Sequence, residues 1–226
     1  MTDLFDTLRH TTLARLLPRA YLRRNAYTFK LDQPSDFAGI DPLDSAAMIE
    51  RTQQLLQQHQ ALWAIGRYAE QRSLYQHPQY TGEDVVHLGL DFTLPVGTPI
   101  YAPLPARVQR CCNYAQAGDF GPTLLLQHNV GEHRFYSLYG HLSRNDLQQH
   151  TAGQQINAGD CIGHIGDTHD NGGWPPHLHL QLIRELDDHS ETVAGVCAIS
   201  DKQAYLRNNP NPSCLVRLDD CQPGTL

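Results

Sequence analysis

The chain has 226 residues, of which 40% are hydrophobic and 18% are charged. This length fits one large domain, or one domain with an extension, and allows a buried core without disulfides. The composition excludes a disordered chain, and a net charge of −7 argues against binding nucleic acid through a broadly basic surface. The longest apolar run is about five residues, against roughly 20 in a membrane-spanning helix, so we expect no integral membrane segment.

Residues 1–80 are predicted to form a helical N-terminal extension, and residues 81–226 a second unit with a C-terminal tail. Apolar residues recur at helical spacing between Leu4 and Leu17, and Pro18 is expected to end that helix. Arginines accompany this apolar stripe. The helix therefore either lies on a membrane surface or docks on a protein, and we favour docking.

A second helix is predicted from Asp41-Pro42 or Asp44 through Gln71, because both starting points carry helix start signals. Its apolar residues form a stripe, and glutamines fill the outer face. His59 lies among those glutamines, so we interpret it as a solvated side chain and not as a ligand. This segment is expected to contribute packing and no chemistry.

Beyond residue 80 the pattern changes to short apolar alternations separated by glycine and proline. The predicted strands are residues 98–102, 105–111, 122–128, 133–140, 160–165 and 177–183. Short strands at this spacing, with no long helix between them, are typical of an antiparallel β sandwich or barrel. We therefore predict a mainly β fold, and we interpret the tail from about residue 184 as an extended loop.

Cysteine and histidine are both frequent, with six and 13 residues respectively. No CxxC pair occurs, which excludes a zinc knuckle and a thioredoxin-like pair and favours reduced thiols. A histidine count this high also makes accidental histidine motifs common. A single HxH is weak support for a metal site, so the argument needs several motifs together.

Three such motifs fall in the β region: HLGLD (87–91), YGHL (139–142) and HLHLQL (177–182). In an extended strand alternate residues share a face, so each motif presents its polar residues on one side. Two histidines and one carboxylate supply three zinc ligands and leave the fourth position for water, which is the pattern of a catalytic zinc site. The two remaining histidines can handle protons. No HExxH helix is present, which excludes the helical zinc-protease arrangement.

The segments HLGLDFTLPVGTPIYAP, YGHL and GGWPPHLHLQL resemble the M23 family of zinc metallopeptidases, the lysostaphin or LytM type, over roughly residues 85–185. The resemblance implies a β-dominated fold of the duplicated hybrid motif type with its site in a groove. It implies that one Zn²⁺ is bound by His87, Asp91 and His179. The catalytic histidines implied in the same way are His141 and His177.

We therefore expect a zinc-dependent metalloendopeptidase that hydrolyses peptide bonds, with peptidoglycan cross-bridges or stem peptides as the substrate class that the resemblance implies. One alternative is a non-catalytic module that binds peptide or activates another enzyme. A second is an accessory domain of an aminotransferase-type partner, because the segments GDFGPTLLLQH, NGGWPPHLHLQL and NPNPSCLV resemble M23 domains fused to class III aminotransferases. The first residues are acidic and lack the apolar stretch of an export signal, so we expect a cytoplasmic location.

Other side chains near these motifs carry weaker signals. Trp174 is a candidate substrate contact, and residues 169–171 either line the groove or only form a turn. Arg72 could bind an anionic substrate group, but we expect a surface arginine. His128 is interpreted as structural and not as a partner of a ligand, and His164 as packing.

Overall fold

The computed structural model describes residues 3–22, 26–32, 35–73, 85–116, 118–187, 190 and 192–216. Its helices are α1 (Leu4–Arg9), α2 (Arg19–Leu22), α3 (Ser45–Gln58), α4 (Arg144–Leu147) and α5 (Lys202–Asn208), with 3-10 turns η1 (Ile199–Asp201) and η2 (Pro212–Leu215). Its strands are β1 (Tyr27–Thr28), β2 (Ala64–Gly66), β3 (Gln71–Arg72), β4 (Val85–His87), β5 (Leu90–Thr93), β6 (Pro99–Tyr101), β7 (Ala106–Tyr114), β8 (Gly121–Val130), β9 (His133–Gly140), β10 (Gln155–Ile156), β11 (Cys161–His164), β12 (His177–Ile183) and β13 (Val196–Ala198). None of these helices is long and apolar enough to cross a bilayer.

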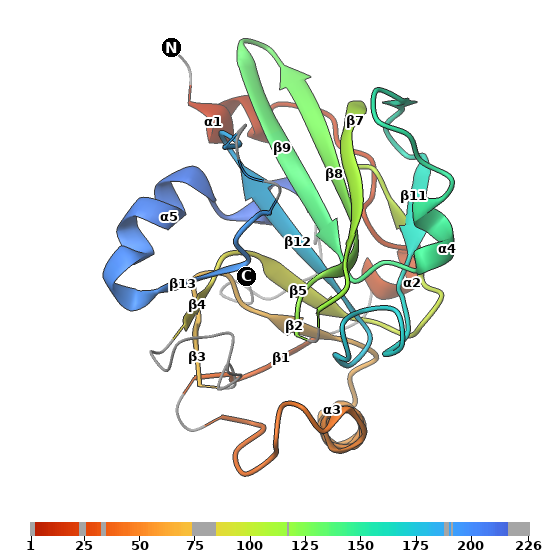
Figure 1. Cartoon of the computed structure of the whole chain (residues 1–226), viewed down its shortest axis with the longest axis vertical. Coiled ribbons are helices and arrows are strands. Elements are labelled where there is room, and N and C mark those ends of the chain that lie inside the picture. Colours follow the sequence, from red (N-terminus) through yellow and green to blue (C-terminus); the bar gives the residue numbers. More distant parts are fainter. Residues whose placement is uncertain are drawn as a thin grey trace.

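One large sheet organises the described part of the chain (Figure 1). Within it, eight strands follow the order β1-β2-β5-β12-β9-β8-β7-β10. β1 and β2 run parallel, and the other neighbouring strands are antiparallel. The remaining described strands form two small sheets, β6 with β11 and β4 between β3 and β13. The predicted mainly β, antiparallel fold class is confirmed.

The six predicted strands are all present. β12 is the clearest case, since its leucines lie in the buried core while His177, His179 and Gln181 occupy the alternate positions. The predicted bounds of β9 and β12 agree with the structure to the residue. Local alternation is thus enough to find β12, which carries two of the candidate site residues.

The second predicted helix is only partly correct. α3 begins after Asp44, whose carboxylate accepts a hydrogen bond from Ala47 N. It ends at Gln58 instead of Gln71, and the chain turns back to form β2. Trp63 and Ile65 have helical spacing relative to α3, but they are fully buried in the main core beside β5. Strand pairing and core burial therefore override the helical pattern.

Two further expectations at the ends of the chain were wrong. α1 ends at Arg9, and Leu16 and Leu17 reach the main core from outside any helix. The buried residues of α1 pack with Phe135 and Leu215, so this helix docks on its own protein. The tail after residue 184 is not an extended loop, since β13, η1, α5 and η2 lie within it.

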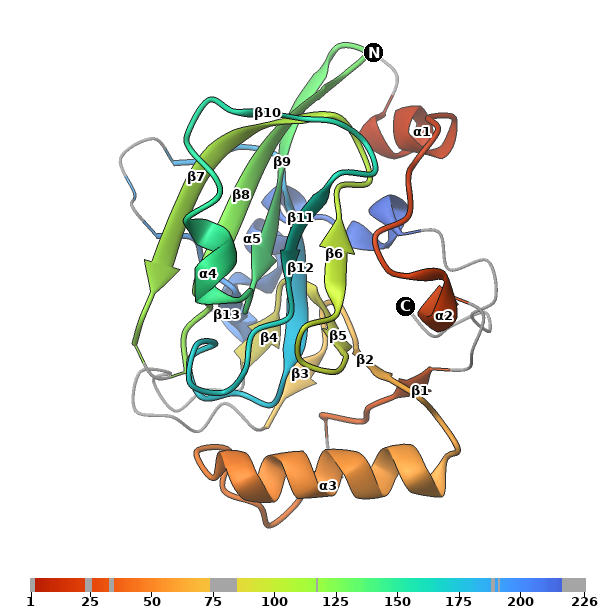
Figure 2. The same ribbon diagram turned by 90° about the vertical axis from the view of Figure 1, so that its right-hand side faces the viewer.

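The N-terminal segment and the β region share one core and one sheet. β1 and β2 extend the large sheet beyond β5, and α3 runs across the same end of the molecule (Figure 2). The predicted boundary between residues 80 and 81 falls in residues 74–84, outside the described residues, and it stays a prediction. Residues before this boundary belong to the same sheet as the strands that carry the site, since β2 pairs with β5.

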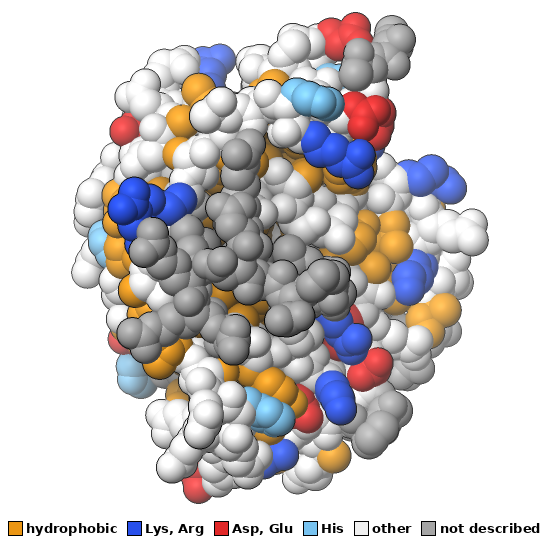
Figure 3. Space-filling view, turned by 180° about the vertical axis from the view of Figure 1, so that it is seen from behind, with side chains coloured by type: hydrophobic (Ala, Val, Ile, Leu, Met, Phe, Trp, Pro, Cys, Tyr) orange, Lys and Arg blue, Asp and Glu red, His pale blue; other side chains and the backbone are white. Residues whose placement is uncertain are grey.

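The face opposite to that of Figure 1 carries arginine and lysine side chains in separate groups, with acidic and apolar side chains between them (Figure 3). Among the described residues, this face therefore offers no single continuous basic surface. The described cysteines, Cys111, Cys112, Cys161, Cys197 and Cys214, are all free.

Because Trp63 is fully buried against Phe92 in the main core, with 6.1 Å between their ring centroids, Trp63→Ala tests how far the N-terminal segment contributes to stability. We expect the free energy of unfolding to fall by about 3–5 kcal/mol, the usual cost of such a cavity. Chemical denaturation followed by circular dichroism measures it. Leu62→Ala is the matched control, since the neighbouring Leu62 is 45% exposed. Equal losses in both variants would contradict the shared core.

Candidate metal centre

Two adjacent strands, β5 and β12, hold the centre of the site. Their pairing sets Asp91 opposite His179 and Thr93 opposite His177. Residues that face each other across an antiparallel pair lie on the same side of the sheet, so the four side chains share one face. On the other side of β12, the last residue of β9, Gly140, lies opposite His179. His141 therefore follows directly beside the same site.

The motif HLGLD is not one continuous strand, as the sequence predicted, but two. β4 ends at His87 and β5 begins at Leu90, and the two strands belong to different sheets. The break lies at Leu88–Gly89. A Cβ at Gly89 would lie 2.6 Å from His179 Cε1 and 2.7 Å from its Nε2. Because Gly89 has no side chain, the imidazole of His179 fits against its backbone. In that position the imidazole lies beside His87.

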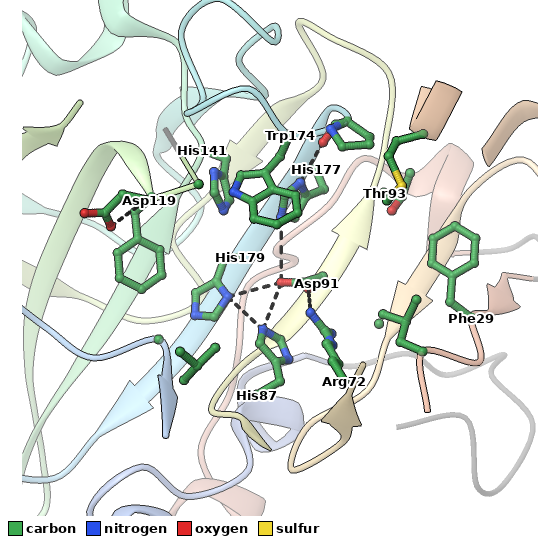
Figure 4. A pocket seen from close by; sticks show the side chains of 18 of the residues that line it. Phe29, Arg72, His87, Asp91, Thr93, Asp119, His141, Trp174, His177 and His179 are labelled. Atoms are coloured by element: carbon green, nitrogen blue, oxygen red, sulfur yellow. Dashed lines mark hydrogen bonds and ion pairs between the residues drawn. The ribbon is translucent and has the colours of Figure 1, made fainter. Parts of the chain in front are cut away.

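The three predicted ligands meet at one point (Figure 4). His87 Nε2 lies 3.0 Å from His179 Nδ1 and 3.2 Å from Asp91 Oδ1, and the last two atoms are 3.1 Å apart. Tetrahedral coordination with zinc–ligand bonds of about 2.0–2.1 Å separates ligand atoms by roughly 3.3 Å. The triangle is therefore close to the size that one zinc ion requires.

Hydrogen bonds behind the two histidines assign the protons on their rings. His87 Nδ1 lies 3.0 Å from the carbonyl oxygen of Arg67, and His179 Nε2 lies 2.9 Å from Gln181 Oε1. Since these oxygens can only accept, both nitrogens carry the proton, which leaves lone pairs on the nitrogens that face each other. Two lone pairs and the carboxylate of Asp91 around one point repel one another unless a cation lies between them. The donor set thus fits a metal ion in its chemistry as well as in its size.

The side-chain amide of Gln181 is fixed in its orientation. Its Nε2 donates to the carbonyl oxygen of Ala194 at 3.0 Å and to Asn209 Oδ1 at 2.8 Å. The amide of Asn209 is oriented in turn, because its Nδ2 donates to the carbonyl oxygen of Tyr205 at 2.9 Å. A flipped Gln181 would lose these bonds and present donors to His179. A chain of oriented amides from the end of α5 therefore holds the tautomer of the ligand.

Arg72 is not the surface arginine that we expected. Its side chain is 4% exposed, and its Nη1 lies 2.6 Å from Asp91 Oδ2, the carboxylate oxygen that faces away from the two histidines. Burial alone favours the neutral acid, but His87 and the Arg72 guanidinium hold the pKa of Asp91 well below its usual range. Burial, with the Arg72 charge, lowers the pKa of His87 to about 4. At neutral pH Asp91 is therefore a carboxylate and His87 a neutral imidazole, the forms that bind metal ions.

His141 and His177 stand side by side at the edge of the triangle, with 4.1 Å between their ring centroids. Their Nδ1 atoms face the carbonyl oxygens of Asn171 and Pro175 at 2.9 and 2.7 Å, so both Nε2 atoms are left without a proton. His177 Nε2 lies 3.9 Å from Asp91 Oδ1. Burial, together with neighbouring histidine rings, holds the pKa of His141 well below its ordinary value, and burial lowers that of His177.

The backbone of His141 adopts φ +62°, which residues other than glycine rarely do. Hydrogen bonds on both sides hold it, since His141 N donates to Phe120 O at 2.8 Å and Gly166 N donates to His141 O at 3.0 Å. A strained backbone that the surrounding structure fixes in this way is common at functional sites. Nothing in the local sequence YGHL signals this conformation.

The remaining candidates divide between the site and the rest of the fold. Trp174, the candidate substrate contact, lines the cleft. Asn171 is fully buried and acts through its backbone carbonyl on His141, while Asp170 pairs with Arg144. His128 does not line the cleft. Its Nδ1 donates to Pro105 O at 3.0 Å, and its Nε2 lies 2.7 Å from Ser137 Oγ.

The site opens into a cleft of about 390 Å³. Its two ends differ in character (Figure 4). One end is lined by Asp119 and His141, and the other by apolar side chains from the N-terminal segment, among them Phe29. The triangle of ligand atoms lies between these ends, so a bound chain has distinct surroundings on either side of the ligands.

The known proteins to which this chain is similar include peptidases. The sequence profile described as Peptidase family M23 matches residues 85–192. A peptidoglycan DD-endopeptidase, ShyA of Vibrio cholerae, is 33% identical over 121 residues, which cover 54% of this chain and 25% of ShyA. A glycyl-glycine endopeptidase, ALE-1 of Staphylococcus capitis, is 34% identical over 99 residues, which cover 43% of this chain and 24% of ALE-1.

Among solved structures, a zinc-containing peptidase from Vibrio cholerae is 28% identical with a TM-score of 0.38, covering 52% of this chain and 34% of that one. The matched part of this chain amounts to a quarter or less of the length of ShyA and ALE-1.

Gln181→Leu should weaken zinc binding about 10–100-fold, because His179 loses the acceptor that fixes its tautomer. Competition with a fluorescent zinc chelator measures the dissociation constant directly. The matched control is Gln155→Leu, since Gln155 is an exposed glutamine on a strand of the same sheet. Unchanged zinc affinity in the Gln181 variant would show that the oriented amide does not support the ligand.

Proposed function

Residues 85–192 form a domain of peptidase family M23, and on that premise we propose that this protein is a zinc-dependent endopeptidase. Its substrates in this proposal are peptides of the peptidoglycan type or related peptides, hydrolysed at backbone amide bonds. The relatives named as a peptidoglycan DD-endopeptidase and a glycyl-glycine endopeptidase support this substrate class.

The observation that carries the proposal is the triangle of His87 Nε2, Asp91 Oδ1 and His179 Nδ1, with sides of 3.0–3.2 Å and unprotonated nitrogens facing its centre. Three protein ligands leave a fourth position open, which is the arrangement of catalytic rather than structural zinc sites. A zinc ion bound there supplies a Lewis acid and lowers the pKa of water toward 7.

His141 and His177 supply the proton chemistry in this proposal. Both are held neutral, and their hydrogen-bonded Nδ1 atoms leave Nε2 as the nitrogen that can accept a proton. One Nε2 takes the proton of the attacking water, and the proton is then delivered to the amine nitrogen as the amide bond breaks. A histidine that has accepted a proton also donates a hydrogen bond to the oxyanion of the tetrahedral intermediate.

Single substitutions separate metal binding from catalysis. We expect His141→Ala and His177→Ala to keep one zinc ion per chain and to lose hydrolysis by about 10²–10⁴-fold, the usual contribution of general acid–base groups. We expect His179→Ala to lose the zinc itself. Native mass spectrometry gives the metal content, and peptide cleavage followed by liquid chromatography gives the rate.

Full activity in both the His141 and the His177 variant would refute their assignment. A folded wild-type protein that takes up no zinc, has no hydrolytic activity and still binds peptide would instead favour the non-catalytic binding module. The exposed His10→Ala serves as a control for a generic histidine substitution, since His10 lies outside the cleft and in another part of the fold.

A further inference from the structure

The sheet face that carries the ligands continues past β5 into the N-terminal segment. Gly66 of β2 lies opposite Asp91, and Ala64 lies opposite Thr93, so both share the face of the site. In the next strand Tyr27 lies opposite Ala64, and Phe29 continues the same alternation. The site face therefore turns from polar to apolar over two strands, and all of the apolar part comes from residues before residue 67.

α3 covers this apolar part of the face. Met48 packs in one buried cluster with Phe29, Leu31 and Phe37. At the start of α3, the hydroxyl of Ser45 donates to the carbonyl oxygen of Gly173. This contact ties the helix to the loop that carries Trp174, so helix and loop together enclose this end of the cleft.

The packed cluster is not closed, because the cleft extends into it. Four side chains from the cluster line the cavity: Phe29, Leu31, Phe37 and Met48. Thr52 also lines the cavity, and its hydroxyl donates to Met48 O at 2.8 Å. Protein interiors rarely leave an apolar hollow larger than a water molecule, so a hollow that opens beside a reactive centre is suited to be filled by a ligand.

At the apolar end of the cleft, the charged side chains lie on the side next to the candidate ligands. The Arg72 guanidinium lies between the apolar walls and the ligands, and it pairs with Asp91 and with Glu70. Gly66 leaves space for it, since a Cβ at this position would lie 2.6 Å from Arg72 Nη2. The other acidic residue of the cleft, Asp119, lines the opposite end. An apolar group entering past Trp174 therefore meets no unpaired carboxylate.

We infer that this end of the cleft is a subsite for a bulky apolar side chain, aliphatic or aromatic, of the peptide substrate at a fixed position next to the cleaved bond. The inference rests on the proposed function and makes it narrower, because a chain of glycines leaves the hollow empty. The N-terminal segment builds the subsite from Phe29, Leu31, Phe37 and Met48, so it acts as a specificity element and not only as packing.

The first test uses the zinc-loaded full chain and a library of randomised peptides with both ends blocked, whose cleavage products are sequenced by mass spectrometry. We expect a large apolar residue to be preferred over glycine by at least about tenfold at one position relative to the cleaved bond. Met48→Ala should reduce this preference by about tenfold. Leu55→Ala is the matched control, because Leu55 belongs to the same helix and buried cluster but does not line the cavity.

The second test does not depend on hydrolysis. Isothermal titration compares the binding of acetyl-Gly-Phe-Gly-amide and acetyl-Gly-Gly-Gly-amide to the zinc-loaded His141→Ala protein. We expect the phenylalanine peptide to bind at least about tenfold more tightly, and Met48→Ala added to this background to reduce the difference while Leu55→Ala leaves it unchanged.

The outcomes separate the subsite from the proposed function. Cleavage without an apolar preference, or an equal effect of Met48→Ala and Leu55→Ala, would overturn the subsite and leave the endopeptidase intact. Selective binding that depends on Met48, in a wild-type protein that cleaves nothing, would support the subsite and overturn the proposed hydrolysis. Equal affinity for both peptides would overturn the subsite whatever the activity.

Discussion

The site depends on the convergence of two imidazole lone pairs and one carboxylate oxygen, all within 3.2 Å of one another. Such a group is unfavourable by itself, because each member repels the other two. The surrounding structure holds it in place from behind, through Arg67 O on His87 and Gln181 on His179. A cation at the centre turns this repulsion into binding energy, and the fixed hydrogen bonds mean that the ligands are already oriented for it.

Most of this support comes from outside the motifs that hold the ligands. Arg72 and the Arg67 carbonyl belong to the segment before the β region, and Asn209 belongs to the tail. The same N-terminal segment supplies β2 and the apolar walls beside the site. The orientation of His87 and Asp91 and the shape of the cleft therefore both depend on the N-terminal segment, so a change in this segment is expected to affect both.

In the proposed function, the two pairs of histidines have different tasks because their free nitrogens face different surroundings. In His87 and His179, the hydrogen-bonded nitrogens point away from the centre of the triangle and the free nitrogens face each other. In His141 and His177, backbone carbonyls occupy Nδ1, and the free Nε2 atoms are available to a substrate. Burial keeps the pKa of His87, His141 and His177 low, so that at neutral pH all three remain without charge. In the proposed function, one residue type thus serves as ligand or as base according to where its free nitrogen points.

The sequence by itself predicted six of the strands and the five candidate residues at the centre. The alternation in β12 and the spacing of the histidine motifs are local patterns, and a strand converts such a pattern directly into a shared face. The resemblance of the same segments to M23 peptidases assigned His87, Asp91 and His179 as ligands, and the structure brings them together.

Only the tertiary structure decided the rest. Arg72 pairs with Asp91 19 residues away, and Gln181 is oriented by Asn209 28 residues away. The end of α3 at Gln58 follows from the pairing of β2 with β5, against the helical pattern that continues in the sequence. These features depend on which distant segments meet in the folded chain, and local spacing carries no information about such contacts.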